Sequence, residues 1–365
     1  MIRSLWRSFV WLWRHSTGRA TAWGFSEGSE QRNLRSLVSH KIYRYVRLPK
    51  KASLGLRIVA SAAMLAVLLT RFPATDIQRW PNWRSESWLW MVASLAATLA
   101  AFGLASIRWL EVCKTLGKPQ KFVDVFNYFV AGQFVGNFLP TTVGGDILRV
   151  SRMGSQIRDH SSAFASVVIE RLTGWLVLPL ITLLAFVFNP GLVDTKGGKT
   201  ALGLAVGTLV LLSLTIYLAE HPRFGGRLSG ESSVTRSLAA VHRGLKLYRR
   251  APSTMLRLLV VAVAFQMCLV IAVVCIANAV DIRLGATVWF AFIPMVFIAQ
   301  VLPVAIGGIG VREAALVLFL DNFGVSSGQS VVLGLLMYAV TLIASLMGVP
   351  AFILGSRHLK SRVRV

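Results

Sequence analysis

Apolar segments separated by short polar stretches dominate the chain after its first 55 residues. A bilayer core of roughly 30 Å requires about 20 consecutive apolar residues of helix to cross it. Six segments are long enough to predict membrane-spanning helices: Leu56–Phe72, Trp88–Leu110, Leu172–Phe188, Ala201–Ala219, Met255–Val280 and Ser330–Leu354. The pattern is typical of an all-α polytopic membrane protein.

Three further apolar segments are shorter: Val125–Leu139, Val288–Leu302 and Val311–Leu320. Pro140 follows the first of them and Pro303 the second. Proline has no N–H to donate and its ring clashes with the preceding turn. We therefore expect a helix to break at each proline.

The basic residues predict the orientation in the membrane. Lys and Arg gather in the N-terminal tail, in the loop 220–257 and at the C-terminal end, so these three regions are expected in the cytoplasm. The less basic loops, expected outside, are 73–87, 189–200, 281–287 and 321–329. Every loop falls on its predicted side if 125–158 and 288–320 are re-entrant. We therefore expect six full spans plus two re-entrant broken-helix hairpins that enter from opposite faces, arranged as an inverted repeat.

Composition divides the chain into three regions. Residues 1–55 are predicted to be a basic cytoplasmic tail, whose beginning is rich in Trp and Arg and predicts an interfacial amphipathic helix. Residues 56–355 are predicted to form the transmembrane domain. Residues 356–365 are expected to be a second basic cytoplasmic tail.

One loop contains a further helical pattern. Leu238, Val241, Leu245 and Tyr248 recur at steps of three and four residues among Arg and Lys. This spacing predicts an amphipathic helix. The helix either lies on the inner leaflet or packs on neighbouring helices, and the pattern does not separate the two.

The balance of charge narrows the class of protein. Of the 365 residues, 55% are hydrophobic and 15% are charged, with 39 Lys and Arg against 15 Asp and Glu. In a soluble protein a net charge of +24 would suggest nucleic acid. Here the charge lies mostly outside the apolar segments, which fits anchoring at anionic headgroups. We expect lipids, and no nucleic acid, as partners.

The sequence contains no recognisable catalytic motif. Cys113 stands alone, and Cys268 and Cys275 share one apolar segment without forming a CxxC pair. A zinc site or disulfide framework is therefore not indicated. No Ser/His/Asp set, nucleotide-binding loop or HExxH motif is present. We expect no metal, no cofactor and no enzymatic activity.

Two segments share the pattern Leu-Pro-x-x-x-Gly-Gly-x-x-x-Arg, one from Leu139 to Arg149 and the other from Leu302 to Arg312. They are 163 residues apart, and each follows an apolar segment. A matching pair of breaks half a chain apart is a stronger signal than one Gly-Gly. Broken helices in two halves of opposite topology are the known architecture of secondary transporters.

The pattern predicts an anion site. The glycine pairs tolerate unusual dihedrals, and a new helix can begin after them with its free N–H groups and positive dipole end facing the break. Such an end favours anions, including phosphate, and the Arg one turn later could pair with the same anion. The alternative is a tight surface hairpin capped by Arg. The predicted residues are Pro140, Gly144, Gly145 and Arg149, and Pro303, Gly307, Gly308 and Arg312.

Carboxylates lie close to these arginines along the chain. Asp146 or Glu170 could neutralise Arg149 or Arg171, and Glu313 could neutralise its neighbour, until a substrate phosphate takes the place of the carboxylate. The alternatives are permanent structural ion pairs or, for Glu170 and Arg171, ordinary interface residues. Two amides, Gln133 and Asn137, precede the first break by one to two turns; they either line a polar path or bridge helices.

A family resemblance rests on five elements of the sequence: Gly132-Gln133 through Pro140; Gly144-Gly145-Asp146 with Arg149; Glu170-Arg171-Leu172; Tyr248 to Pro252; and Pro303 with Gly307-Gly308-x-Gly310-x-Arg312-Glu313. In these the chain resembles the transmembrane region of lysylphosphatidylglycerol synthases, and the free-standing flippase-like membrane proteins of that family. The similarity covers roughly residues 55–355. It implies lipid translocation in a bacterial inner membrane.

The resemblance also limits the activity. In bifunctional members a separate soluble domain makes the aminoacylated lipid, and this chain stops at Val365, so we expect no aminoacyl transfer. We expect it to flip an anionic phospholipid or a polyprenyl-linked lipid, with both termini cytoplasmic. The alternative is a non-catalytic accessory protein or scaffold for a lipid- or glycan-modifying enzyme.

Overall fold

The structure is a computed structural model, and it describes residues 84–138, 144–220, 233–301, 308 and 310–353. All of these belong to the second of the two units into which the chain divides, Ala60–Val365. The predicted span Leu56–Phe72 and both predicted tails lie outside the described residues.

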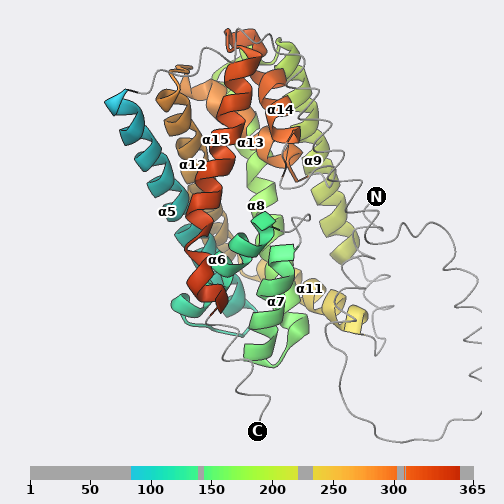
Figure 1. Ribbon diagram of the computed structural model, residues 1–365. Coiled ribbons are helices and arrows are strands. Elements are labelled where there is room, and N and C mark those ends of the chain that lie inside the picture. The colour runs from blue at the N-terminus through green and yellow to red at the C-terminus, as the bar shows by residue number, and fades with distance from the viewer. Residues whose placement is uncertain (1–83, 139–143, 221–232, 302–307, 309, 354–365) are drawn as a thin grey trace, which may run out of the picture. The chain divides into compact units, whose positions relative to one another are not determined.

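All the regular structure in the described part of the chain is helical (Figure 1). The α-helices are α5 (Ser85–Thr115), α6 (Phe122–Phe138), α7 (Gly144–Ile157), α8 (His160–Phe188), α9 (Lys196–Glu220), α11 (Ser233–Arg250), α12 (Pro252–Ala279), α13 (Ala286–Ala299), α14 (Val311–Leu320) and α15 (Ser327–Ser345). Two short 3-10 helices, η1 (Pro190–Leu192) and η3 (Asp321–Phe323), lie in the connections.

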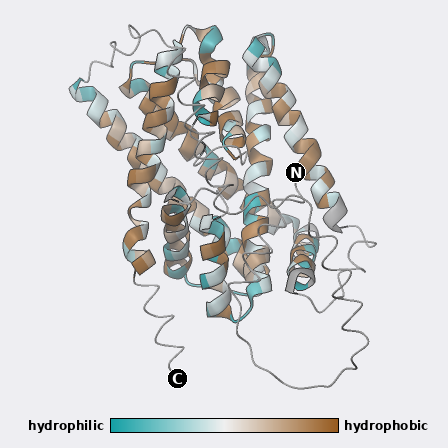
Figure 2. Cartoon of the chain, turned by 45° about the vertical axis from the view of Figure 1, so that its right-hand side comes forward, coloured by the Kyte–Doolittle hydropathy of each residue, from teal (hydrophilic) through white to brown (hydrophobic). Residues whose placement is uncertain are grey.

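Five of these helices are long and apolar enough to cross a membrane: α5, α8, α9, α12 and α15. They correspond to five of the six predicted spans. Large apolar side chains remain exposed along them, including Phe188, Val210 and Val260. Figure 2 shows hydrophobic residues running along the long helices. Soluble monomers rarely expose so much apolar surface, so the chain is a multi-pass membrane protein.

Helix α8 begins at His160, well before the apolar segment predicted to start at Leu172. Asp159 caps it: its carboxylate accepts hydrogen bonds from the N–H groups of Ser161, at 3.1 Å, and Ser162, at 3.0 Å. Burial by itself would raise the pKa of Asp159, but bonds from Ser162 and the nearby charge of Lys118 outweigh it and lower that pKa. A capping carboxylate stabilises the first turn, so the helix begins at the polar residues that directly follow Asp159.

Two pairs of shorter helices lie in different parts of the unit (Figure 1). Helices α6 and α7 pack on each other in the lower half of the view, and α13 and α14 pack on each other in the upper half. The connections 139–143 and 302–307, which contain Pro140, Pro303 and Gly307, lie outside the described residues. The expected proline breaks therefore stay predictions.

Helix α13 forms the centre of the main hydrophobic core. It packs on α8, α9, α12 and α14, and Ala291, Phe292 and Ile293 have no exposed surface. The ring of Phe292 stacks on that of Phe319 from α14, with the ring centres 5.4 Å apart. A helix that is apolar on every side must be enclosed by others, and the neighbouring helices of the unit enclose α13 in this way.

The predicted amphipathic helix is α11, and it packs mainly on α8. Val241 and Tyr248 from the predicted stripe are buried, whereas Leu238 and Leu245 are half-buried. Gly244 lies so close to α8 that an added Cβ would meet the side chain of Ile169. The packing of α11 on α8 therefore accounts for the buried face of this helix.

Candidate functional site

The site begins with a close contact between α6 and α7. A Cβ at Gly132 of α6 would lie 2.8 Å from Cγ of Arg149 and 3.0 Å from the carbonyl oxygen of Gly145 on α7. A Cβ at Gly145 would overlap the carbonyl oxygen of Gly132. Small residues let two helix backbones approach in this way inside a membrane. The glycines therefore place the side chain of Arg149 directly against α6.

Arg149 lies at the centre of a buried network of charges from α5, α7 and α8. Its Nη2 is 3.2 Å from Oε2 of Glu170, and its Nη1 is 3.2 Å from Oδ1 of Asp146. Glu170 also pairs through Oε1 with Arg108 of α5. Asp146 also accepts from Nη2 of Arg171, at 2.9 Å. Three arginines and two carboxylates thus form one continuous chain of ion pairs, which we call the arginine cluster.

Aromatic rings enclose the centre of the arginine cluster. The guanidinium carbon of Arg149 lies 4.2 Å from the ring centre of Trp109 and 5.0 Å from that of Phe129. Trp109 is itself held in place, because its indole N–H donates to Oγ of Ser166 at 2.9 Å. Cation–π contacts are stronger where water is excluded. The rings fix the Arg149 guanidinium and still leave part of its edge for hydrogen bonding.

The charges of the arginine cluster do not balance. Its three arginines carry one charge more than its two carboxylates, and Arg108, Arg149 and Glu170 are almost fully buried. Several guanidinium nitrogens are buried without a hydrogen-bond partner among the described residues: Nε and Nη1 of Arg108, Nε of Arg149 and Nε of Arg171. Buried cationic donors without partners are costly. An anion with several acceptor oxygens would satisfy them.

A second buried pair lies at the start of α14. Oε1 of Glu313 accepts from Nη2 of Arg312 at 2.6 Å and from its Nε at 3.1 Å. Oε2 of Glu313 accepts from the backbone N–H of Gly310 at 2.6 Å. Gly308 and Gly310 have φ angles of +75° and +89°, in the left-handed region that favours glycine. These glycines let the chain turn sharply into α14 and place the carboxylate at its N-terminus.

Tyr338 of α15 lies between the two motifs. Its hydroxyl donates to the backbone carbonyl of Asn137, at the end of α6, over 3.4 Å. Its ring centre lies 5.6 Å from the guanidinium carbon of Arg312. The end of α6 and the start of α14 are therefore both within reach of one side chain, although they are far apart in the sequence.

The structure thus brings together four residues singled out in the sequence: Asp146, Arg149, Glu170 and Arg171. Arg312 and Glu313 form their own pair. The remaining positions are distributed as follows: Gly144 and Gly145 are buried in the first turn of α7, Gly308 precedes α14, Gln133 is half-buried on α6, and Asn137 has a buried Nδ2 without a partner in the described part of the chain.

Sequence reasoning missed Arg108 and Trp109. Arg108 is a charged residue inside the predicted span Trp88–Leu110, and a charge at that depth is by itself a signal of function. Trp109 carried no signal, because tryptophan is common at membrane interfaces. Its role depends on the reach of the Arg149 side chain from α7 to its ring on α5.

Comparison with models of known protein families identifies a family for this chain. The family model described as the lysylphosphatidylglycerol synthase TM region matches residues 54–348, which is well over half of the chain. The matched range contains every residue of the arginine cluster and of the Arg312–Glu313 pair. No curated protein matches the chain.

Proposed function

The chain belongs to the family of lysylphosphatidylglycerol synthase transmembrane regions, and on that premise we propose that it moves an anionic phospholipid or lipid-linked substrate across the bilayer. Membership implies a role connected with membrane lipids. The choice of an anion, and of movement rather than covalent chemistry, is our inference.

The observation that carries this proposal is the unbalanced arginine cluster. One positive charge in excess, together with unpaired donors on Arg108 and Arg149, suits a phosphate group with several acceptor oxygens. Glu170 already pairs with one nitrogen of Arg108 and one of Arg149, and Asp146 pairs with a second nitrogen of Arg149. A headgroup phosphate that replaces one carboxylate would keep every arginine paired, so substrate can enter and leave without stranding a buried charge.

The second motif extends the proposal to both halves of the protein. Helices α6 and α7 lie toward one end of the unit and α13 and α14 toward the other (Figure 1), which supports two re-entrant hairpins that enter from opposite faces. Arg312 and Glu313 repeat the pairing of arginine with carboxylate in the second half. We propose that a headgroup is held alternately by Arg149 and Arg312, with Glu313 in the role of Glu170.

The proposed setting is the bacterial inner membrane, with both termini in the cytoplasm and lipids as the partners. We propose no catalytic activity and no cofactor. A purified chain that moves no lipid but binds a lipid- or glycan-modifying enzyme in a fixed ratio would support an accessory role instead.

The test is lipid translocation in proteoliposomes. Wild-type protein, Arg149→Ala and Arg312→Ala are reconstituted with a fluorescent phosphatidylglycerol, and a membrane-impermeant quencher reports which leaflet the probe occupies. Both variants are expected to lose translocation while they still insert into the membrane. The matched control is Arg243→Ala on the exposed face of α11, which should translocate like wild type. Normal translocation by both site variants would refute the anion site.

A further inference from the structure

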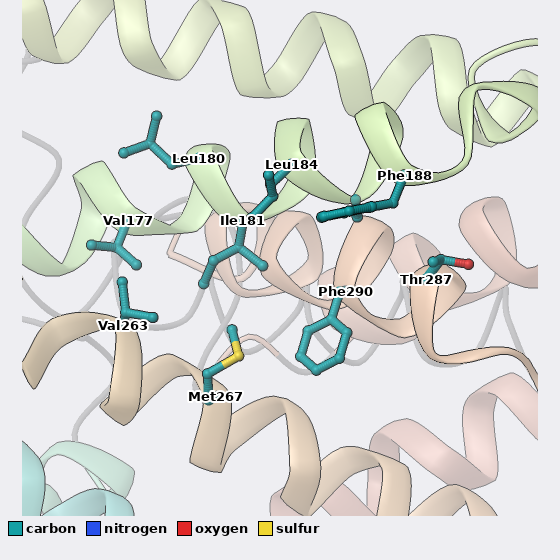
Figure 3. A pocket seen from close by; sticks show the side chains of 10 residues that line it. Val177, Leu180, Ile181, Leu184, Phe188, Val263, Met267, Thr287 and Phe290 are labelled. Carbon is teal, nitrogen blue, oxygen red and sulfur yellow. The ribbon is translucent and has the colours of Figure 1, made fainter. Parts of the chain in front are cut away.

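An apolar groove runs along α8, where α12 and α13 approach it. Its volume is about 330 Å³, which is within the roughly 300–1,000 Å³ of known ligand pockets. Figure 3 shows Val177 and Ile181 of α8 facing Val263 and Met267 of α12. Thr287 is the single polar residue among those that line the groove, so its walls suit hydrocarbon.

The groove continues the face of α8 that carries Glu170. Val177, Ile181, Leu184 and Phe188 follow Glu170 at steps of seven, four, three and four residues, which is one stripe of an α-helix. At 1.5 Å per residue, Val177 lies about 10 Å along the helix from Glu170, and Phe188 about 16 Å further on. One end of the groove therefore lies near the arginine cluster.

Two polar side chains with unpartnered atoms, those of Arg108 and Gln266, lie at the junction between the arginine cluster and the groove. The Arg108 guanidinium covers α8 at Gly174, where an added Cβ would lie 2.8 Å from Nη1. That nitrogen is buried and has no partner among the described residues. Gln266 of α12, which lies between Val263 and Met267 in the sequence, donates to the carbonyl of Gly174 at 3.5 Å. The groove thus leads from hydrocarbon-lined walls to a buried guanidinium that pairs with Glu170 through Nη2 and has an unpartnered Nη1.

We propose that the groove holds one hydrocarbon chain of the lipid whose anionic headgroup lies at Arg108 and Arg149. This inference rests on the proposed function and names the substrate class: a lipid with a phosphate-type headgroup and a long hydrocarbon chain, recognised at both ends. A free phosphate would use only the arginine cluster. The lipid lies with its headgroup toward the His160 end of α8, as in the leaflet at that end.

The test is photo-crosslinking in phosphatidylcholine proteoliposomes. The probe is phosphatidylglycerol with a diazirine in the middle of one acyl chain, and the matched probe is phosphatidylcholine with the same chain. Peptide mass spectrometry locates the labelled residues. We expect groove residues to be labelled about tenfold more by the anionic probe, since a tenfold preference corresponds to only about 1.4 kcal/mol.

Two variants separate the groove from the surrounding lipid-facing surface. Val263→Trp fills the groove and should reduce its labelling to the phosphatidylcholine level. Val260→Trp adds the same ring at an exposed valine of the same helix outside the groove, and should leave the labelling unchanged. Arg108→Met should remove the preference for the anionic probe without lowering the total labelling of the surface. These variants keep the test valid if one of them is poorly folded.

The outcomes separate this inference from the transport proposal. Equal labelling by both probes, unaffected by Val263→Trp, means ordinary surrounding lipid and overturns the groove site, even where translocation proceeds. Preferential labelling that Val263→Trp removes supports the site. If that labelling occurs in a wild-type protein that moves no lipid, the transport proposal fails and the lipid site stands.

Discussion

Removal of the Glu170 carboxylate should destabilise the protein in a way that an anionic lipid can reverse. Glu170 is buried and pairs with both Arg108 and Arg149. In Glu170→Gln the side chain keeps its shape but loses its charge. The arginine cluster then holds three cations and one carboxylate, so its excess charge rises from one to two.

The expected magnitude follows from the burial of both partners. Breaking a buried ion pair by removing one member costs about 3–5 kcal/mol, because the other charge is left uncompensated. The amide oxygen of Gln can still accept one hydrogen bond, so we expect the lower end of that range. The double variant Glu170→Gln/Arg149→Met restores the excess to one charge and should recover part of the loss.

The assay is thermal unfolding of the purified protein in detergent, with added phosphatidylglycerol or phosphatidylcholine. Glu170→Gln is expected to unfold at a lower temperature than wild type, and phosphatidylglycerol should raise that temperature more in the variant than in wild type. The reason is that a headgroup phosphate replaces the missing carboxylate. If the variant is as stable as wild type, or if both lipids act equally, the exchange of carboxylate for phosphate is refuted.

Three further predictions test the packing that positions the site. Gly145→Ala should force α6 and α7 apart and lower the free energy of unfolding of the protein by about 1–3 kcal/mol. The control is Gly207→Ala on α9, where the added methyl group meets open space, and this variant should be as stable as wild type or more stable in the same melting assay. Arg152→Ala should free the segment around Ala351 and Phe352 from α7, because Arg152 donates to the backbone carbonyls of these two residues at 2.8 Å each. Limited proteolysis should cleave the variant near this segment earlier than it cleaves wild type. The pKa of Asp159 lies below its ordinary 3.8 in the folded protein, so its charge stabilises α8 above about pH 4, and that stability is lost as the pH falls further. The difference in melting temperature between wild type and Asp159→Asn should therefore shrink from pH 6 to pH 3. A difference that stays constant over this range would contradict the argument.

Much of the helical framework could be predicted because a membrane demands long apolar segments, which are visible in any sequence. Five of the predicted spans are helices of spanning length and composition, and the spacing of Val241 and Tyr248 predicted the buried face of α11. The start of α8 at His160 was not predicted. Its first three residues are polar, and the charged pair Glu170-Arg171 separates its first turns from the longer apolar segment. The start depends on the cap from Asp159 and on packing against α7, neither of which appears in a hydropathy pattern.

The sequence by itself pointed to four residues of the arginine cluster, Asp146, Arg149, Glu170 and Arg171, but not to Arg108. The paired Gly-Gly motifs and their arginines stand out because breaks and charges are rare inside apolar segments. Only the tertiary structure decided how those charges pair. Arg108 reaches Glu170 across 62 residues of sequence, and Arg149 lies against Phe129 of α6 because Gly132 and Gly145 let α6 and α7 touch. Such contacts depend on the packing of helices side by side, which the order of residues along one chain does not reveal.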